Sequence, residues 1–195
     1  MPMEKETEKE VAKEVANEIA KAPANESRAG KNMMIIAWII ALALLTYYFR
    51  FWETQQYNPN PVPNQSTNSE GINEVTLERN RSNHYVTAGF INQVPVIFLL
   101  DTGATDVVVP SRLAEKLGLQ AIYSATAQTA NGTATVFATV IESIQIGNIH
   151  FQNVRASINP NMGDMEVLLG MSALKEVEFV QRGDTLTLRQ APQTR

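Results

Sequence analysis

The side chain with the strongest indication of chemistry is Asp101, within the run Phe98-Leu99-Leu100-Asp101-Thr102-Gly103-Ala104-Thr105. An ionisable aspartate directly after three large apolar residues enters a β core only when its charge is hydrogen-bonded or functional. A simple turn is the structural alternative, because Asp can cap backbone amides and Gly can supply a positive φ. The context favours a functional acid, since apolar strands are predicted on both sides of the triplet.

Few other side chains are candidates for chemistry. The chain has no cysteine, so it has neither a disulfide framework nor a thiol nucleophile. His84 and His150 lie far apart and lack ligand-spaced neighbours, whereas a zinc site needs three or four convergent ligands, so we expect two surface histidines, no metal and no cofactor. Asp184, Asp164 and Glu166 lie in turn or loop sequences, and we interpret them as solvated.

Composition excludes other classes of partner. A length of 195 residues suits one domain with appendages. The net charge of −4 and the pI near 5.3 provide no basic field, and no segment interleaves Lys or Arg with aromatic residues. We therefore expect no nucleic-acid partner.

From about Arg81 the sequence changes to short β-rich runs separated by turn residues. Asn92-Gln93 and Asn131-Gly132 each predict a hairpin, and Pro95 indicates an edge or the start of a strand. Ser111 to Leu117 is predicted to be a short helix that ends at Gly118. The strands are expected at 85–91, 94–100, 107–109, 125–129, 133–141, 143–146, 150–158, 167–169, 179–180 and 185–188. This pattern is typical of a mostly antiparallel β-domain, either a small barrel or a sandwich.

With these elements in this order, the chain resembles the retropepsin-like aspartic proteases, in particular their bacterial membrane-anchored branch. The resemblance covers Tyr85 to Leu188. It rests on the Leu-Leu-Asp-Thr-Gly-Ala-Thr loop, on a hairpin around Ala130 to Thr133 at the place of the family's flap, and on Val167-Leu168-Leu169-Gly170. It implies a mostly β fold, a closed retropepsin-like barrel with one lobe per chain, and a short helix at about 172–177.

The resemblance also implies roles for individual residues. Asp101 matches the catalytic carboxylate, and Thr102 matches the residue whose hydroxyl bonds across a dimer. Gly103 and Ala104 would offer backbone to the substrate. Asp106 matches a substrate-contacting acid, while Thr105 replaces the acid that many viral members carry before it. The family places substrate contacts at Ala130, Asn131 and Gly132, and packing beside the catalytic loop at Leu168, Leu169 and Gly170.

One loop is half of such a site. Peptide hydrolysis by carboxylates needs an ionised group to take a proton from water and a protonated group to give a proton to the carbonyl oxygen. Two carboxylates about 3 Å apart share one proton, as in aspartic proteases generally. Because Asp101 lies in the only Asp-Thr-Gly of the chain, we expect a homodimer in which each subunit contributes Asp101 across a two-fold axis.

The N-terminal third predicts a membrane anchor. Residues 1–32 are polar, with at most a marginal helix, and are interpreted as a solvated tail in preference to a partner-binding helix. Residues 33–52 are apolar and reach about the 30 Å thickness of a bilayer core. A cleaved signal peptide is the alternative, but the Ala-x-Ala-like triplet Ala41-Leu42-Ala43 lies inside the apolar run rather than after it.

Charge predicts the orientation. Lys21, Arg28 and Lys31 precede the uncharged run Met33–Phe49, and only Arg50 follows this run before Arg79, so we expect a cytoplasmic N-terminus and an extracytoplasmic C-terminal domain, periplasmic in a bacterium. The polar residues 53–80 are expected to be a disordered linker, 81–190 the protease domain, and 191–195 a tail.

The favoured function is a membrane-anchored aspartic endopeptidase that acts on protein or peptide substrates. Two alternatives remain at this point: a non-catalytic peptide-binding or scaffolding domain of the same fold, and a β-rich envelope protein in which Asp101 only caps a turn.

Overall fold

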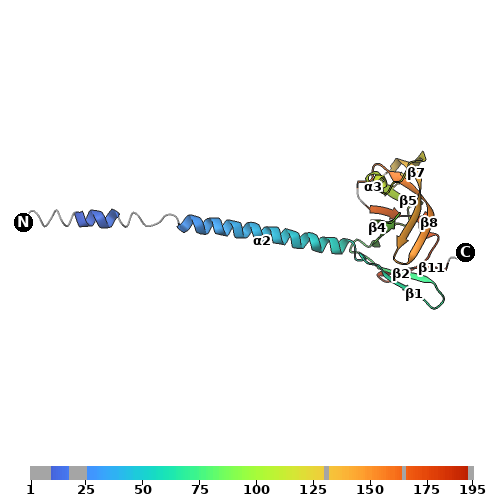
Figure 1. Cartoon of the computed structure of the whole chain (residues 1–195), viewed down its shortest axis with the longest axis horizontal. Coiled ribbons are helices and arrows are strands. Elements are labelled where there is room, and N and C mark those ends of the chain that lie inside the picture. The colour runs from blue at the N-terminus through green and yellow to red at the C-terminus, as the bar shows by residue number, and fades with distance from the viewer. Residues whose placement is uncertain (1–9, 18–25, 130–131, 164–165, 193–195) are drawn as a thin grey trace, which may run out of the picture. The chain divides into compact units, whose positions relative to one another are not determined.

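The computed structural model describes residues 10–17, 26–129, 132–163 and 166–192, and the chain divides into two compact units, Met1–Phe51 and Trp52–Arg195. The first unit contains a helix over residues 10–17 and most of helix α2 (Glu26–Tyr57), and the second contains the β-domain (Figure 1). Val11 and Val15 of the first helix are exposed.

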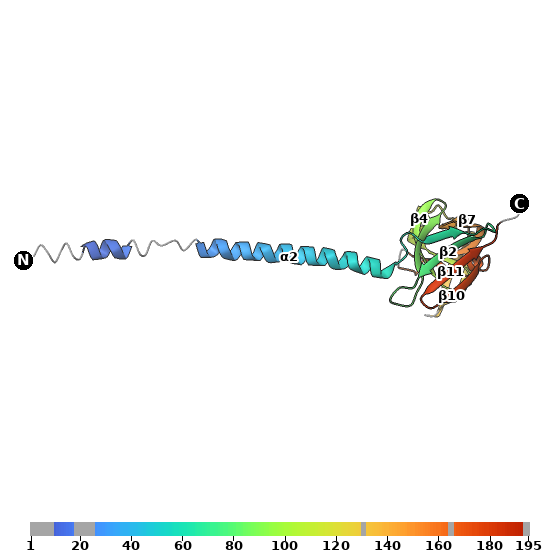
Figure 2. The same ribbon diagram turned by 90° about the horizontal axis from the view of Figure 1, so that it is seen from below.

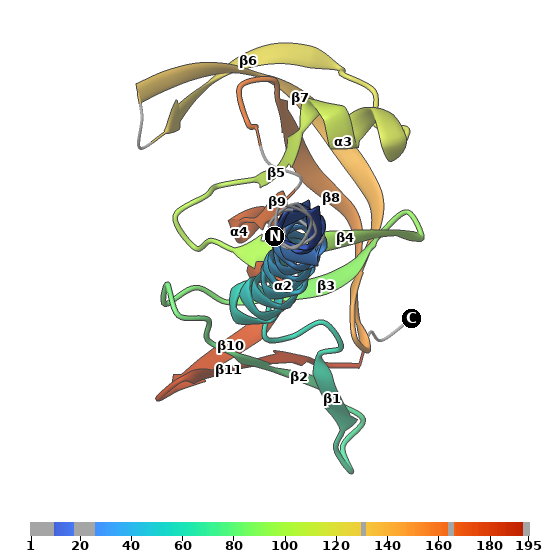
Figure 3. The ribbon, with the colours of Figure 1, turned by 90° about the vertical axis from the view of Figure 1, so that its left-hand side faces the viewer.

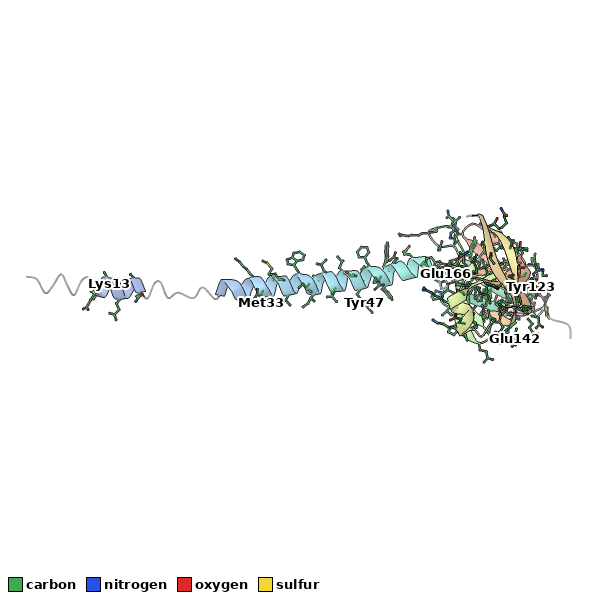
Figure 4. All side chains as sticks on the ribbon, turned by 90° about the horizontal axis from the view of Figure 1, so that it is seen from above. Lys13, Met33, Tyr47, Tyr123, Glu142 and Glu166 are labelled. Carbon is green, nitrogen blue, oxygen red and sulfur yellow. The ribbon has the colours of Figure 1, made fainter. Side chains whose placement is uncertain are left out.

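Helix α2 is apolar along most of its length. The stretch Gly30–Glu53 is long and apolar enough to cross a membrane, and it contains the expected span at 33–52. Its side chains, including Met33 and Tyr47, are exposed along the helix (Figure 4). Both membrane anchors and signal sequences have this length and composition.

The β-domain is built on a closed barrel. A seven-stranded sheet has the order β3-β4-β9-β5-β8-β7-β6, and β3 also pairs with β7 through Phe90–Gln145 and Ile91–Ile144, which closes the barrel (Figure 3). The predicted closed β-barrel is thus confirmed. Its strands are β3 (Val86–Ile91), β4 (Val94–Leu100), β5 (Val107–Pro110), β6 (Tyr123–Thr129), β7 (Gly132–Ile146), β8 (Ile149–Asn159) and β9 (Glu166–Leu169).

Local turn chemistry explains the first hairpin. Asn92 and Gln93 both have positive φ, of 48° and 70°, as the two central residues of a type I′ turn require. The β3–β4 hairpin that they join is antiparallel, as expected. Most other pairings are antiparallel too, in keeping with the expectation of a mostly antiparallel domain, while β4 pairs with β9 and β5 pairs with β8 in parallel.

A second sheet corrects the expected linker at 53–80. Strands β1 (Asn64–Thr67), β2 (Asn73–Glu78), β11 (Thr185–Gln190) and β10 (Glu178–Arg182) form a four-stranded sheet in that order, and three of them are seen together in Figure 2. Val75 and Leu77 of β2 are fully buried in the same core as Leu188 of β11. The linker prediction is therefore wrong for this segment. Most residues of this segment are polar, but Val75 and Leu77 alternate along β2 and form one apolar face, which packs against β11 and the barrel.

Asn60 is the first residue after α2 that the domain holds firmly. Its side chain is buried and donates to the carbonyl oxygens of Glu78 and Val86, at 2.9 and 2.8 Å. Its Oδ1 accepts from the Glu78 N–H, and its backbone oxygen accepts from the Ala88 N–H. The domain thus begins near residue 58, about 20 residues before the expected boundary at 81.

Two short helices complete the fold. Helix α3 (Ser111–Lys116) buries Leu113 and Ala114, and Gly118 follows it with a φ of +69°, as predicted for its C-terminal end. Helix α4 (Met171–Leu174) begins one residue before the expected helix, and a hydrogen bond from the Val177 N–H to the Leu174 oxygen extends its last turn.

Candidate active site

Asp101 follows directly on β4 and is held by two neighbouring segments. Leu100 is in register with Leu169 of the parallel strand β9, and the Asp101 N–H donates to the Leu169 oxygen at 3.1 Å. On the other side, the Leu100 N–H donates to the Tyr85 oxygen at 3.0 Å. Asp101 itself is half-buried. Its carboxyl group therefore reaches the surface while its backbone N–H stays hydrogen-bonded to β9.

The loop after Asp101 is a tight turn. Oδ1 of Asp101 accepts from the Gly103 N–H at 2.9 Å, and the Ala104 N–H donates to the Asp101 oxygen at 3.2 Å. Asp101 therefore caps a turn, as expected if the triplet were a simple turn. Thr102 and Gly103 are exposed at the tip of this turn. Capping orients the carboxyl group, and it is compatible with chemistry on that group.

Helix α4 fixes the second half of the loop. The N–H groups of Met171 and Ser172 donate to the oxygens of Ala104 and Thr105, at 2.8 and 2.9 Å. Gly170 lies so close to the loop that a Cβ there would be 2.2 Å from the Asp106 oxygen and 2.7 Å from the Ala104 oxygen. The expected packing residues Leu168 and Leu169 lie on β9, and Leu168 pairs with Val108 of β5 just beyond the loop.

Ser172 is a supporting residue that the sequence did not indicate. Its buried hydroxyl donates to the Arg155 oxygen at 2.7 Å and accepts from the Val107 N–H at 3.0 Å. It thereby joins α4, β8 and β5 at the end of the loop. A serine at the start of a short helix carries no local signal for this role, because its partners are 17 and 65 residues away.

We expect Ser172→Ala to destabilise the protein by about 1 to 3 kcal/mol, because it leaves the buried Val107 N–H without a partner. The urea dependence of the near-UV circular dichroism measures this. Ser143→Ala is the matched control, since Ser143 is exposed on β7 and should change stability by less than about 0.5 kcal/mol. Equal stability of the two variants would contradict a bracing role for Ser172.

Asp106, expected to contact substrate, is engaged by another side chain. Its Oδ1 accepts from Nε of Arg155 on β8 at 2.7 Å, and the two side chains are 29% and 64% exposed. A pair this exposed contributes at most about 1 kcal/mol. The structure therefore places Asp106 within the surface next to the loop, already neutralised by Arg155.

The expected flap is the β6–β7 hairpin, in which Gly132 pairs with Thr129 and has a φ of +107°. Ala130 and Asn131 lie outside the described residues. β6 lies at the edge of the seven-stranded sheet, and β7, which carries Gly132, pairs with β6, β8 and β3. The substrate contact expected at Gly132 stays a prediction.

A pocket of about 310 Å³ lies beside Thr102, between the barrel and the four-stranded sheet. Leu174 of α4 and the leucines of β11 form its apolar wall, and Phe179 and Gln181 of β10 complete it. The Tyr85 hydroxyl that borders it is buried, and within the described part of the chain it has no hydrogen-bond partner.

Asp184 and the two histidines lie at the surface. Asp184 lies in the β10–β11 turn and pairs with Arg79, as a surface turn acid would. His84 and His150 are both exposed. Among the described residues, no group of three or more His, Cys, Asp or Glu side chains is placed to hold a metal ion. Within one chain, Asp101 is the single carboxyl group of the turn Asp101–Ala104, and the nearby Asp106 is paired with Arg155.

Comparisons with known proteins converge on the segment that carries this loop. Residues 87–176, from β3 to the end of α4, match the family described as "gag-polyprotein putative aspartyl protease". The crystal structure of a retropepsin-like aspartic protease from Rickettsia conorii is similar with 31% identity and a TM-score of 0.55, over 65% of this chain and 96% of that one.

Two curated bacterial proteins without an assigned function are also similar. One, from Sinorhizobium sp., is encoded in the cobV 5′ region and is 31% identical over 175 residues, which cover 83% of this chain and 75% of the relative. The other, from Rickettsia prowazekii, is 30% identical over 145 residues, and the match spans 61% of its length. The Sinorhizobium match includes 83% of this chain, which is more than the β-domain at 58–195 makes up. The match therefore extends into the sequence of helix α2.

Proposed function

We propose, because the chain belongs to the retropepsin-like aspartic protease family, that it is an aspartic endopeptidase that hydrolyses peptide bonds in protein substrates. The observation that carries this proposal is the geometry of the Asp101 loop. Its backbone is bonded to β9 on one side and to α4 on the other, while Thr102 and Gly103 remain exposed at the tip. A rigid loop that presents one carboxyl group at the surface is suited to be half of a two-carboxylate site.

In the proposed mechanism, a second copy of the chain supplies the second carboxyl group. One Asp101 is ionised and takes a proton from water, whose oxygen adds to the carbonyl carbon of the substrate. The other Asp101 is protonated and gives its proton to the carbonyl oxygen. The Asp101 that accepted the proton from water then gives it to the nitrogen, and the C–N bond of the tetrahedral adduct breaks to release the amine. A hydroxyl group of the adduct returns its proton to the other Asp101 as the carboxylic acid product forms. Sharing one proton keeps the pair ready for this exchange.

The exposed loop tip supports an isologous dimer. Thr102 is exposed at the tip of the turn and borders the 310 Å³ pocket. In a two-fold arrangement the same tip of each subunit meets the other, which brings both copies of Asp101 together. Thr102 is the residue we assign to the contact across the axis.

We further propose that α2 anchors the enzyme, with the N-terminus in the cytoplasm and the protease domain outside. The apolar stretch Gly30–Glu53 supports the anchor, and the extension of the Sinorhizobium match into α2 indicates that this helix is not peculiar to one chain. Two anchored copies meet at a raised effective concentration, which favours the dimer.

Mixing wild-type and Asp101→Asn chains tests the shared site. If each active site needs Asp101 from both chains, activity falls with the square of the wild-type fraction, so an equal mixture has about one quarter of the wild-type activity. The measurement is the hydrolysis of fluorescein-labelled casein by full-length chains that are co-expressed with two different tags and quantified after purification. Co-expression with an Asp184→Asn chain is the matched control and should leave activity unchanged. A linear fall to about one half would show that each chain works alone.

A further inference from the structure

The connection between helix α2 and the β-domain is short and bonded. The apolar stretch of α2 ends at Glu53, and the helix itself ends at Tyr57. Only two residues separate Tyr57 from Asn60, which is buried and bonded to β2 and β3. The structure therefore replaces the expected flexible linker of 53–80 with a few residues.

Contacts within the second unit also hold the last turn of the helix. The side-chain amide of Asn80 donates to the Tyr57 oxygen at 3.0 Å. The guanidinium carbon of Arg81 lies 4.9 Å from the centre of the Trp52 ring, within the range of a cation–π contact. Asn80 and Arg81 both follow β2 in the chain, so the same segment that enters the core also holds the end of the helix.

These contacts limit how far the domain can move from the membrane. From Glu53 to Tyr57 a helix rises by about 6 Å, and from Tyr57 to Asn60 an extended chain spans at most about 11 Å. A domain of this size has a diameter of about 40 Å. No part of it can lie more than about 60 Å from the end of the membrane span. A fully extended linker over 53–80 would by itself have allowed a distance of about 90 Å between the membrane span and the start of the domain.

We infer that this enzyme cuts protein segments that lie next to the membrane surface, in proteins inserted into or bound to the same membrane. The inference rests on the proposed function as a membrane-anchored protease, and it narrows the substrate class of that site. Peptide bonds farther from the membrane are out of reach, however well their sequences fit the cleft.

The test is a distance series in liposomes that contain the full-length protein. Each reporter has one membrane helix that continues as a rigid (EAAAK)ₙ rod, at about 1.5 Å per residue, and ends in the same fluorescein-labelled casein segment. We expect efficient cleavage with rods of up to about 40 Å and a fall of at least about 10-fold with a rod of about 120 Å. Insertion of a Gly/Ser segment of about 80 residues between Tyr57 and Asn58 should recover most cleavage of the distant reporter.

The matched control carries the same insertion between Glu70 and Gly71, in the exposed β1–β2 turn, where it lengthens no connection to the membrane. It should show the distance dependence of the wild type. Equal cleavage of all reporters by the wild-type protein would overturn the inference. Hydrolysis of soluble casein separates the two proposals. If casein is cut in an Asp101-dependent way but the membrane reporters show no distance dependence, only the inference is refuted. If casein is not cut at all, the proposed function is refuted as well.

Discussion

Asp101→Asn is expected to lower the rate of casein hydrolysis by the full-length protein by at least about 10³-fold, because an amide can neither take a proton from water nor donate one to the carbonyl oxygen as a carboxyl group does. The fold should be kept. The Asn side chain retains an oxygen at the position of Oδ1, which accepts from the Gly103 N–H at 2.9 Å, so the turn keeps its capping bond. The measurements are the initial rate and the urea dependence of the near-UV circular dichroism.

Asp184→Asn is the control for this substitution. It removes the same charge from a surface turn, where the carboxylate pairs with Arg79, and should leave the rate within about two-fold of wild type. If Asp101→Asn were fully active, the aspartate would serve only as a turn cap. If Asp101→Asn bound peptides normally and the wild type did not cut them, a peptide-binding domain would be the better description.

Gly170→Ala is expected to have the largest effect on stability. The new methyl group would lie 2.2 Å from the Asp106 oxygen and 2.7 Å from that of Ala104, and both are backbone atoms that no rotamer change can move. Either β9 and α4 shift, or the loop does. We expect a loss of about 3 kcal/mol in unfolding free energy. We also expect at least about 100-fold lower activity in the folded fraction, because the loop that carries Asp101 is displaced.

Gly163→Ala is the matched control for Gly170→Ala. A methyl group at residue 163 meets no atom within 4 Å, and the backbone there does not have positive φ. Its effect should stay within about 0.5 kcal/mol, in the urea unfolding experiment used for Gly170→Ala. A Gly170→Ala protein with wild-type stability and activity would mean that the loop and α4 can separate without cost, against the tight packing between them.

The β-rich fold class and most of the turns could be predicted because their signals are local, whereas the closed barrel was implied only by the resemblance to a known family. Asn92-Gln93 favours positive φ at two consecutive positions, and Gly118 ends a helix whose apolar face precedes it. The apolar strand before Asp101 likewise indicates that the triplet emerges from a core. Each of these inferences uses residues within about ten positions of one another.

Other features depend on partners far along the chain. Val75 and Leu77 belong to a strand because Leu188 and Leu186, more than 100 residues later, cover the same face. Before that pairing is known, Asn-rich and Pro-rich surroundings favour a linker. The role of Ser172 is hidden for the same reason, because its hydroxyl bonds to segments of β5 and β8 that only the fold brings together.

The Asp-Thr-Gly loop, its place after a buried strand and the apolar stretch before the domain can all be predicted from the amino-acid sequence, since each follows from the chemistry of neighbouring residues. Three other features become visible in the folded chain alone: Gly170 packs against the loop, Arg155 pairs with Asp106, and Asn60 connects the segment after α2 to β2 and β3. The physical reason is that close packing and buried hydrogen bonds join segments distant in sequence, and no local pattern encodes which ones will meet.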